Sequence, residues 1–452
     1  METENKIRVI KKIKFWKSKS NNGNYLIDSG LLLTFLEENG FRKYKNISIC
    51  LRDNIGYSIT DNEMFNFCHE FVKSRENSTL LDCFMKQGNR IFIQKFGVLT
   101  TLKECEYDLL RDTKEITYIP FSNTIVSVTK NRINLISYTD LKNKFVLNEN
   151  LIERNFYQVE EVSVIEEFVN CISFCSKSKE CIMSSIGYLL SNFKDPRNPK
   201  AIILTDFLSQ SKEAAEGGSG KGLIVQAIKQ MKINVVTENG KNLNLESSFA
   251  YQSVSLNTKV FFLDDIKKGF DFEYLFSITT NDFKVEQKGK QAFKIPYVDS
   301  PKILIATNYP IKGNESSFNR RKHTVLLRNF FNDKNTPFIY FNHTFFEDWN
   351  LNEFNRFDNF MIQCAMLFLE RGLILFENDE VKKKMIKDHI PNEVFERLEA
   401  CEINKVLKIK NLGLSNTLGV NEYAEYKGLE VKKSISSGNT TIKFTEPFNN
   451  TK

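Results

Sequence analysis

The residues best placed to do chemistry stand in one glycine-rich stretch, residues 216–225, which reads EGGSGKGLIV. It follows an apolar, strand-like run, residues 201–205, and its second half continues into a helix that is expected to begin near Gly222. Small residues and a lysine at such a junction let backbone N–H groups and an ammonium surround the phosphates of a nucleotide. The expected nucleotide-binding residues are Gly217, Gly218, Ser219, Gly220, Lys221 and Gly222.

This stretch departs from the common phosphate-loop pattern G-x-x-x-x-G-K-[ST] at two positions. Ala215 stands at the first glycine, and Gly222 stands where a hydroxyl would help to hold Mg²⁺. Taken alone, the stretch is also compatible with a plain glycine-rich turn. Its assignment as a site for ATP and Mg²⁺ therefore depends on partners elsewhere in the chain.

Two carboxylates supply the first partners. The run VFFLDD, residues 260–265, has the form of a buried strand that ends in Asp264 and Asp265. In phosphoryl-transfer sites one acid holds Mg²⁺ while a neighbouring group orients or deprotonates the attacking nucleophile. We expect Asp264 to be the metal ligand and Asp265 the catalytic base, although such a run is often only a strand end.

Three more polar residues extend the expected catalytic set. The apolar run KILIATN ends in Asn308, whose amide could bond the γ-phosphate or the attacking water, or could simply form a turn. Arg320 and Arg321 follow in the sequence FNRR. A guanidinium that reaches a neighbouring subunit's nucleotide would stabilise transition-state charge, whereas the alternative is a basic surface turn.

A charged hairpin is expected between the second and third of these motifs. Residues 283–294 read FKVEQKGKQAFK, with two short strand-like arms around Lys288, Gly289 and Lys290. In a ring of subunits such tips would line the pore, where Lys288 and Lys290 would contact the phosphates of single-stranded DNA. A solvated hairpin without a partner is the competing interpretation.

The composition agrees with a soluble, intracellular protein of several domains. The 452 residues are 41% hydrophobic and carry a net charge of +7, which permits nucleic-acid binding without requiring it. The nine cysteines are scattered without a CxxC pair, and the odd count without a signal peptide favours a reducing cytosol. No apolar run is long enough for a membrane span, so we expect cytoplasmic localisation in a bacterial host cell.

The pattern of apolar residues and breaks predicts five parts. Residues 1–160 should form an N-terminal accessory α+β domain, and residues 161–199 a helical collar or linker. Residues 200–330 should form the ATPase core, followed by a helical extension over residues 331–376. Residues 377–452 should form a small C-terminal domain that a winged helix would fit.

Several elements can be predicted individually. Residues 30–40 and 62–72 have the pattern of helices, the first closed by an Asn-Gly cap. Residues 90–94, 124–128 and 133–138 look like strands. Near the C-terminus, a helix over residues 420–427 should precede a hairpin with arms at residues 431–435 and 440–444.

In order and spacing, GGSGKG, VFFLDD, VEQKGKQ, KILIATN and FNRR resemble the motifs of the superfamily 3 helicases. The likeness is strongest to the helicase part of primase-helicases from phages and mobile elements of Bacteroidetes-like bacteria, and it is firm over residues 200–330. It implies an α/β fold with a modified AAA+ P-loop NTPase core, in which helices flank a mostly parallel central sheet.

The same resemblance implies function and partners. It implies ATP and Mg²⁺ as cofactors, a homo-oligomeric ring of six subunits, and 3′ to 5′ translocation on single-stranded DNA and on forked DNA. No primase catalytic motif is visible in the chain, so the resemblance carries the helicase half alone and leaves room for a separate primase as a partner. The departures are Gly222 and an unusually long connection, residues 206–215, before the loop.

Two other functions remain open from the sequence. An ATP-switched origin-binding or loading factor without strand separation would accord with Gly222 and with a C-terminal winged helix. A small-molecule kinase is disfavoured, because kinase loops of the GSGKG type place a hydroxyl residue where Leu223 stands.

Overall fold

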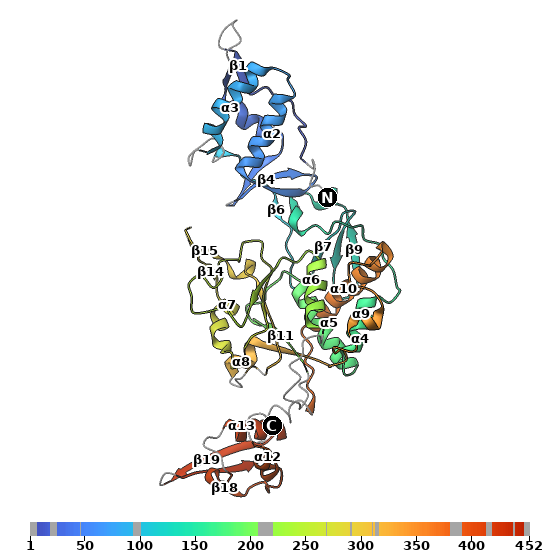
Figure 1. Ribbon diagram of the computed structural model, residues 1–452, viewed down its shortest axis with the longest axis vertical. Coiled ribbons are helices and arrows are strands. Elements are labelled where there is room, and N and C mark those ends of the chain that lie inside the picture. The colour runs from blue at the N-terminus through green and yellow to red at the C-terminus, as the bar shows by residue number, and fades with distance from the viewer. Residues whose placement is uncertain are drawn as a thin grey trace. The chain divides into compact units, whose positions relative to one another are not determined.

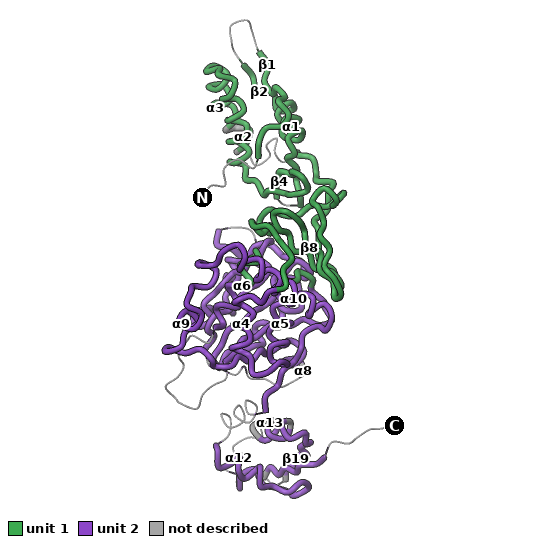
Figure 2. The backbone as a smooth tube through the Cα atoms, turned by 90° about the vertical axis from the view of Figure 1, so that its right-hand side faces the viewer, with its two compact units in different colours: residues 1–160, 190–193, 227–234 green, residues 161–189, 194–226, 235–452 purple. Residues whose placement is uncertain are grey.

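The computed structural model describes residues 7–18, 25–45, 47–93, 101–206, 220–267, 269–289, 292–309, 311, 316–379, 391–412, 418–436 and 439–446. The chain divides into two compact units. One comprises residues 1–160, 190–193 and 227–234, and the other comprises residues 161–189, 194–226 and 235–452 (Figure 2). The five-part division expected from the sequence stays a prediction. Among the described helices, none combines the length and apolar character that a bilayer crossing requires.

Helices α1 (Ser29–Glu38), α2 (Asp61–Lys73) and α3 (Ser78–Ile93) surround an aromatic core in the first unit. Asp28 caps α1 by accepting hydrogen bonds from two backbone N–H groups, and α1 ends at Asn39 before Gly40, whose φ is 80°. Thr60 and Glu63 form a capping box at the start of α2. Both helices predicted in this region are confirmed.

The strand predicted at residues 90–94 is wrong, because α3 continues to Ile93. Leu80, Phe84 and Phe92 are buried at spacings of four and eight residues, which place them on one face of a helix. The five-residue window RIFIQ is too short to reveal that period, because β-branched and aromatic residues favour a strand locally. Packing of the apolar face along the whole of α3 therefore determines that these residues are helical.

The remaining strands of the first unit form three sheets. Strands β1 (Trp16–Ser18) and β2 (Tyr25–Ile27) pair antiparallel. A five-stranded sheet has the order β3 (Phe41–Tyr44), β4 (Ile47–Arg52), β5 (Ile55–Ile59), β10 (Lys144–Leu147) and β6 (Asp108–Leu109). A three-stranded sheet joins β7 (Thr117–Pro120), β8 (Ile125–Val128) and β9 (Ile133–Ile136). Strands β8 and β9 confirm two of the predicted strands.

A five-stranded parallel sheet is the centre of the second unit. Its order is β12 (Val235–Asn239), β13 (Val260–Asp264), β16 (Lys302–Thr307), β11 (Ala201–Asp206) and β17 (Lys322–Leu327). All residues of β11 and β16 are buried, because helices cover both faces of a sheet of this kind. The α/β class with a parallel central sheet is therefore confirmed.

Helices flank this sheet. In Figure 1, α4 (Val164–Cys171), α5 (Ser176–Leu190) and α10 (Leu351–Arg371) lie to the right of β11, whereas α7 (Phe276–Thr280) and α8 (Ser316–Arg321) lie to its left. Helix α6 (Lys221–Gln230) follows the glycine-rich stretch, and α9 (Pro337–Phe341) precedes α10. Helices α5 and α10 approach closely at Gly187, where a Cβ would lie 2.1 Å from the carbonyl oxygen of Cys364.

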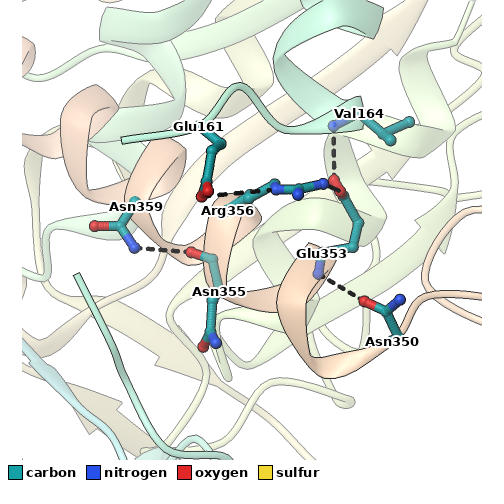
Figure 3. A network of polar contacts seen from close by, with 7 residues as sticks. All are labelled: Glu161, Val164, Asn350, Glu353, Asn355, Arg356 and Asn359. Atoms are coloured by element: carbon teal, nitrogen blue, oxygen red, sulfur yellow. Dashed lines mark hydrogen bonds and ion pairs between the residues drawn. The ribbon is translucent and has the colours of Figure 1, made fainter. Parts of the chain in front are cut away.

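A network of polar contacts fixes the start of α4 against α10 (Figure 3). The buried Glu353 accepts a hydrogen bond from the backbone N–H of Val164 at 2.6 Å. Arg356 pairs with Glu353 at 3.3 Å and with Glu161 at 3.9 Å, and Asn350 accepts from the Glu353 N–H as the cap of α10. Because a buried carboxylate is stable only when partnered, this network holds α4 in place.

The C-terminal residues form a small α+β group with its own core. It consists of α12 (Asn392–Glu399), β18 (Val406–Lys408), α13 (Leu418–Lys427), β19 (Glu430–Ser436) and β20 (Asn439–Thr445). The three strands pair antiparallel in the order β18-β20-β19. Phe395, Tyr423 and Phe444 pack in the core beneath them. The predicted helix followed by a hairpin is confirmed.

Candidate functional site

The candidate site lies at the carboxyl edge of the parallel sheet. Strand β11 ends at Asp206, β13 ends at Asp264, and Asn308 directly follows β16. Parallel pairing sets Thr205 opposite Thr307, so these strand ends meet at one edge. Ligands of open parallel sheets bind outside this edge. Of the expected loop residues, Gly217, Gly218 and Ser219 lie outside the described residues.

Lys221, the first residue of α6, lies between two of these strand ends. Its Nζ donates a hydrogen bond to Asn308 Oδ1 at 2.6 Å and forms an ion pair with Asp206 Oδ2. The side chains of Lys221 and Asp206 are only 16% and 8% exposed. The structure therefore brings together the expected lysine and asparagine, and it places an ammonium where phosphate oxygens would bind.

Asp206 is the residue that sequence reasoning missed. It ends the run AIILTD in the same way as Asp264 ends VFFLD, so an apolar run closed by a carboxylate was the available signal. Its other oxygen, Oδ1, is buried and has no hydrogen-bond partner in the described part of the chain. A carboxylate oxygen left in that state is a site for a cation or a donor.

Helix α4 positions the exit of the loop through Gly220. The φ of Gly220 is 92°, which side chains rarely tolerate, and a Cβ there would lie 2.4 Å from the ring of Phe168. Phe168 is fully buried on α4 and stacks on Phe331, with ring centroids 5.5 Å apart. Only glycine therefore fits between α4 and the start of α6.

Gly222 has no such steric reason to be glycine. A Cβ at this position would meet no atom within 4 Å, so the second residue of α6 faces open space. The space for a hydroxyl residue exists although the residue itself is absent. Any protein ligand for a metal ion at this site must come from another position.

The two acids at the end of β13, Asp264 and Asp265, have different surroundings. Asp264 is exposed, and its carbonyl oxygen accepts a hydrogen bond from Gly240 N–H at 2.6 Å. Asp265 has a φ of 53° and pairs with Lys241, whose pKa is raised mainly by the hydrogen bond to this carboxylate. Lys241 also lines a cavity of about 450 Å³, together with neighbours that include Phe270, Asp271 and Tyr274. Among the described residues, the Lys221 ammonium is held by Asp206 and Asn308.

The structure distinguishes the two adjacent arginines of α8. The Arg321 guanidinium lies 4.5 Å above the ring of Phe276 and donates to Ser317 O at 3.0 Å. Burial, and then the charge of Arg320, lower the pKa of Arg321. The side chain of Arg320 is instead exposed to solvent. Arg321 is thus packed within its own chain, whereas Arg320 is available to another molecule.

The charged hairpin expected from the sequence consists of β14 (Phe283–Val285) and β15 (Phe293–Ile295), which pair antiparallel. Phe283, Val285 and Ile295 anchor it in the core, and Lys288 is exposed beside Gly289 at the tip. Lys290 lies outside the described residues. The geometry leaves the Lys288 ammonium accessible to a polyanion.

No group of three metal-ligating His, Cys, Asp or Glu side chains occurs in the part of the chain that the structure describes. Mg²⁺ at nucleotide sites is commonly bound by one or two carboxylates together with phosphate oxygens and water. Asp206 and Asp264, both at the carboxyl edge of the sheet, supply carboxylates of this kind. The residues present therefore fit a metal ion that arrives with a nucleotide.

Comparisons with known proteins find a family model that matches part of the chain and distantly similar solved structures. A model described as a family of unknown function, DUF5906, matches residues 214–321, which include Lys221, Asp264, Asn308 and Arg320. No curated protein sequence matches the chain. The apo A form of the NrS-1 C-terminal region is 12% identical with a TM-score of 0.43, over 92% of this chain and 99% of that chain.

Two structures of JCV helicase, one with a bound small molecule, are also similar. They are 12% and 14% identical, each with a TM-score of 0.25, over 52% of this chain and 64% of the helicase chain. All three TM-scores lie below 0.5.

Proposed function

We propose that this protein is an ATP-dependent DNA helicase of superfamily 3 type that acts in the replication of a phage or mobile element. The observation that carries the proposal is the contact of Lys221 with Asn308 at the carboxyl edge of the parallel sheet. An ammonium and an amide meet there beside a helix N-terminus, which is the arrangement that binds and senses phosphate groups. The sheet with its flanking helices accords with a modified AAA+ core.

The cofactors of this function are ATP and Mg²⁺. Lys221 would neutralise the β- and γ-phosphates while backbone groups of the loop, residues 217–220, donate to their oxygens. Asp264 would bind Mg²⁺ through water, and Asn308 would hold the γ-phosphate or the attacking water. Asp265 would act as the base after exchanging its Lys241 partner, which lies at the surface and is easily displaced.

The position of Arg320 supports a ring in which neighbours share each site. Arg320 precedes β17, and Asp206 is level with Leu327 at the other end of that strand. At about 3.3 Å per residue, the two ends lie roughly 15–20 Å apart. Arg320 is therefore remote from the nucleotide of its own chain, and we propose that it completes the site of the adjacent subunit in a homohexamer.

The DNA ligand of the proposed ring is single-stranded and forked DNA. Lys288 at the hairpin tip, with Lys290 beside it in the sequence, would contact backbone phosphates without reading bases. A primase on a separate chain would provide the primers. DNA binding would explain why the hairpin tip carries an exposed lysine, which the stability of the hairpin alone does not require.

The test is ATP hydrolysis by the full chain with and without single-stranded DNA. Lys221→Ala should reduce the DNA-stimulated rate by on the order of a hundredfold or more, because a preorganised charge on the transferring phosphoryl group is lost. Lys177→Ala, at an exposed lysine of α5, is the matched control and should retain the rate. Equal rates for Lys221→Ala and the parent would refute the proposal.

One observation favours a second function, an ATP-switched loading factor. The C-terminal group has a helix, α13, followed by a hairpin, β19–β20, and a third strand, which accords with a winged helix that holds duplex DNA. Such a factor would bind and hydrolyse ATP without separating strands. Displacement of a labelled strand from forked DNA by the parent, and its absence with Lys221→Ala, would exclude the loading factor.

A further inference from the structure

Asp206 is a buried carboxylate that the proposed function does not yet use. Its side chain is 8% exposed, Oδ2 pairs with Lys221, and Oδ1 is buried without a hydrogen-bond partner among the described residues. Removal of a carboxylate from water is costly unless its oxygens meet donors or cations. Lys221 satisfies one side of Asp206, and the other side remains available to a ligand.

Nucleotide binding changes the balance of charge around Asp206. In the proposed function, which this inference extends, Lys221 turns to the phosphates of ATP and Asp206 loses its ion-pair partner. The carboxylate then lies buried beside several negative charges. At an effective dielectric of about 20, two unit charges 4 Å apart repel strongly enough to oppose binding substantially. A nucleotide without a cation is therefore disfavoured, and a divalent cation relieves the repulsion.

We propose that Asp206 is a protein ligand of the Mg²⁺ ion that enters with the nucleotide, in place of the hydroxyl missing at Gly222. Carboxylate oxygens are preferred ligands of Mg²⁺, and one or two of them with phosphate oxygens and water complete its shell. Glycine at residue 222 supplies no ligand oxygen of its own, so the protein ligand must come from elsewhere. The carboxylate of Asp206 then takes over the metal-binding role of the hydroxyl that is absent at residue 222.

The sheet order separates the roles of Asp206 and Asp264. Strand β16 lies between β11 and β13, so the ends of β11 and β13 are two strand spacings apart, or about 10 Å. Asp206 is buried beside the Lys221 ammonium, whereas Asp264 is exposed one strand beyond β16. Asp206 is therefore the direct ligand and Asp264 acts through a bound water.

Equilibrium binding of a fluorescent ATP analogue to the full chain tests this assignment without relying on turnover. The quantity is the ratio of the dissociation constant in EDTA to that in saturating Mg²⁺. For the parent the ratio should be large. Asp206→Asn should lower it on the order of tenfold to a hundredfold, in line with the loss of a metal-site group. In EDTA the variant should bind at least as tightly as the parent, because repulsion is removed.

Gly222→Ser supplies the matched second variant. In the Asp206→Asn background, the introduced hydroxyl should restore most of the Mg²⁺ ratio. In the parent background it should change the ratio by less than about threefold, because the ion already has its protein ligand. This single variant keeps the proposal testable even where Asp206→Asn folds poorly.

Two results would overturn the assignment. An Asp206→Asn protein that binds more tightly by the same factor in Mg²⁺ and in EDTA would show that Asp206 only restrains Lys221. A large gain in the Mg²⁺ ratio from Gly222→Ser alone would show that the ion lacks a protein ligand in the parent. Absence of analogue binding by the parent in both buffers would instead refute the nucleotide site, and with it the proposed function.

Discussion

Two neighbouring arginines of identical chemistry have different surroundings in this fold. Arg321 covers the ring of Phe276 and bonds a backbone carbonyl of its own helix, so its charge is engaged in packing. Arg320 projects into solvent at the amino end of β17. A residue that acts in a neighbouring site must be exposed in the single chain, and only Arg320 meets this requirement.

Arg320→Ala should therefore abolish hydrolysis while leaving nucleotide binding intact. We expect a loss on the order of a thousandfold in DNA-stimulated ATPase rate, the magnitude typical of an arginine supplied in trans. Mixing Arg320→Ala protein with Lys221→Ala protein should restore part of the rate, because at some interfaces an intact Arg320 meets an intact Lys221. No recovery on mixing would contradict action between subunits.

Arg321→Ala is the contrasting variant at the next position. It should lower the free energy of unfolding by about 1 kcal/mol through the lost contact with Phe276. In thermal unfolding this corresponds to a shift of roughly 2–4 °C for a unit of this size. A hydrolysis defect in Arg321→Ala as deep as that of Arg320→Ala, with no change in melting temperature, would reverse the two assignments.

At the scale of elements, α4 connects the polar network at α10 to the exit of the glycine-rich loop. Glu353 and Arg356 hold the start of α4, and the ring of Phe168 on that helix occupies the space beside Gly220. The conformation at the start of α6, and hence the position of Lys221, depends on a helix from a distant part of the sequence. The position of Gly220 is thus set by packing against Phe168 as well as by its own conformation.

Gly220→Ala should disrupt this support. Its φ of 92° and the 2.4 Å approach to Phe168 require movement of α4 or α6, at a cost of about 1–3 kcal/mol. Gly222→Ala, two residues further on and inside α6, is the control, because its Cβ meets no atom and helix propensity favours alanine by about 1 kcal/mol. Thermal unfolding should show opposite shifts for the two variants, and shifts of the same sign would contradict the packing argument.

At the scale of the whole sheet, a buried lysine makes stability depend on pH. Lys194 donates to Ser300 Oγ at 2.6 Å and lies 4.3 Å from the centre of the Tyr297 ring, near the amino end of β16. Burial lowers the pKa of Lys194 to about 7. Because the pKa of an unfolded lysine is about 10.4, the unfolded chain binds a proton that the folded chain releases between these values. Stability therefore rises with pH across this interval.

Lys194→Met should be more stable than the parent, by the largest margin near and below pH 7. The margin should shrink as pH rises toward 9, by up to about 1.4 kcal/mol per pH unit, because the proton that Lys194 must release on folding is lost more easily as pH approaches the unfolded pKa. Thermal unfolding of both proteins across this pH range measures the margin. Lys177→Met, at an exposed lysine, should give a difference that does not vary with pH.

The sequence by itself determined the parts of this protein that local chemistry controls. Alternation, caps and apolar runs predicted α1, α2, the C-terminal hairpin and three strands of the central sheet, β11, β13 and β16, but not β12 or β17. The glycine-rich stretch was recognisable from its composition. The acids of VFFLDD and the asparagine of KILIATN were recognisable as polar residues that end apolar runs, and parallel strands present such residues at one edge of the sheet. The strand wrongly expected within α3 shows that a five-residue window is too short to distinguish a helix from a strand.

Only the tertiary structure decided which of these residues meet. Strand order depends on packing between distant segments, and here β16 lies between β11 and β13, so Asn308 and Asp206 reach Lys221 whereas Asp264 is a strand further away. Burial likewise separates Arg320 from Arg321, and the ring of Phe168 explains Gly220 but not Gly222. A linear pattern records which side chains are present, but contacts between remote elements set their distances, burial and charge.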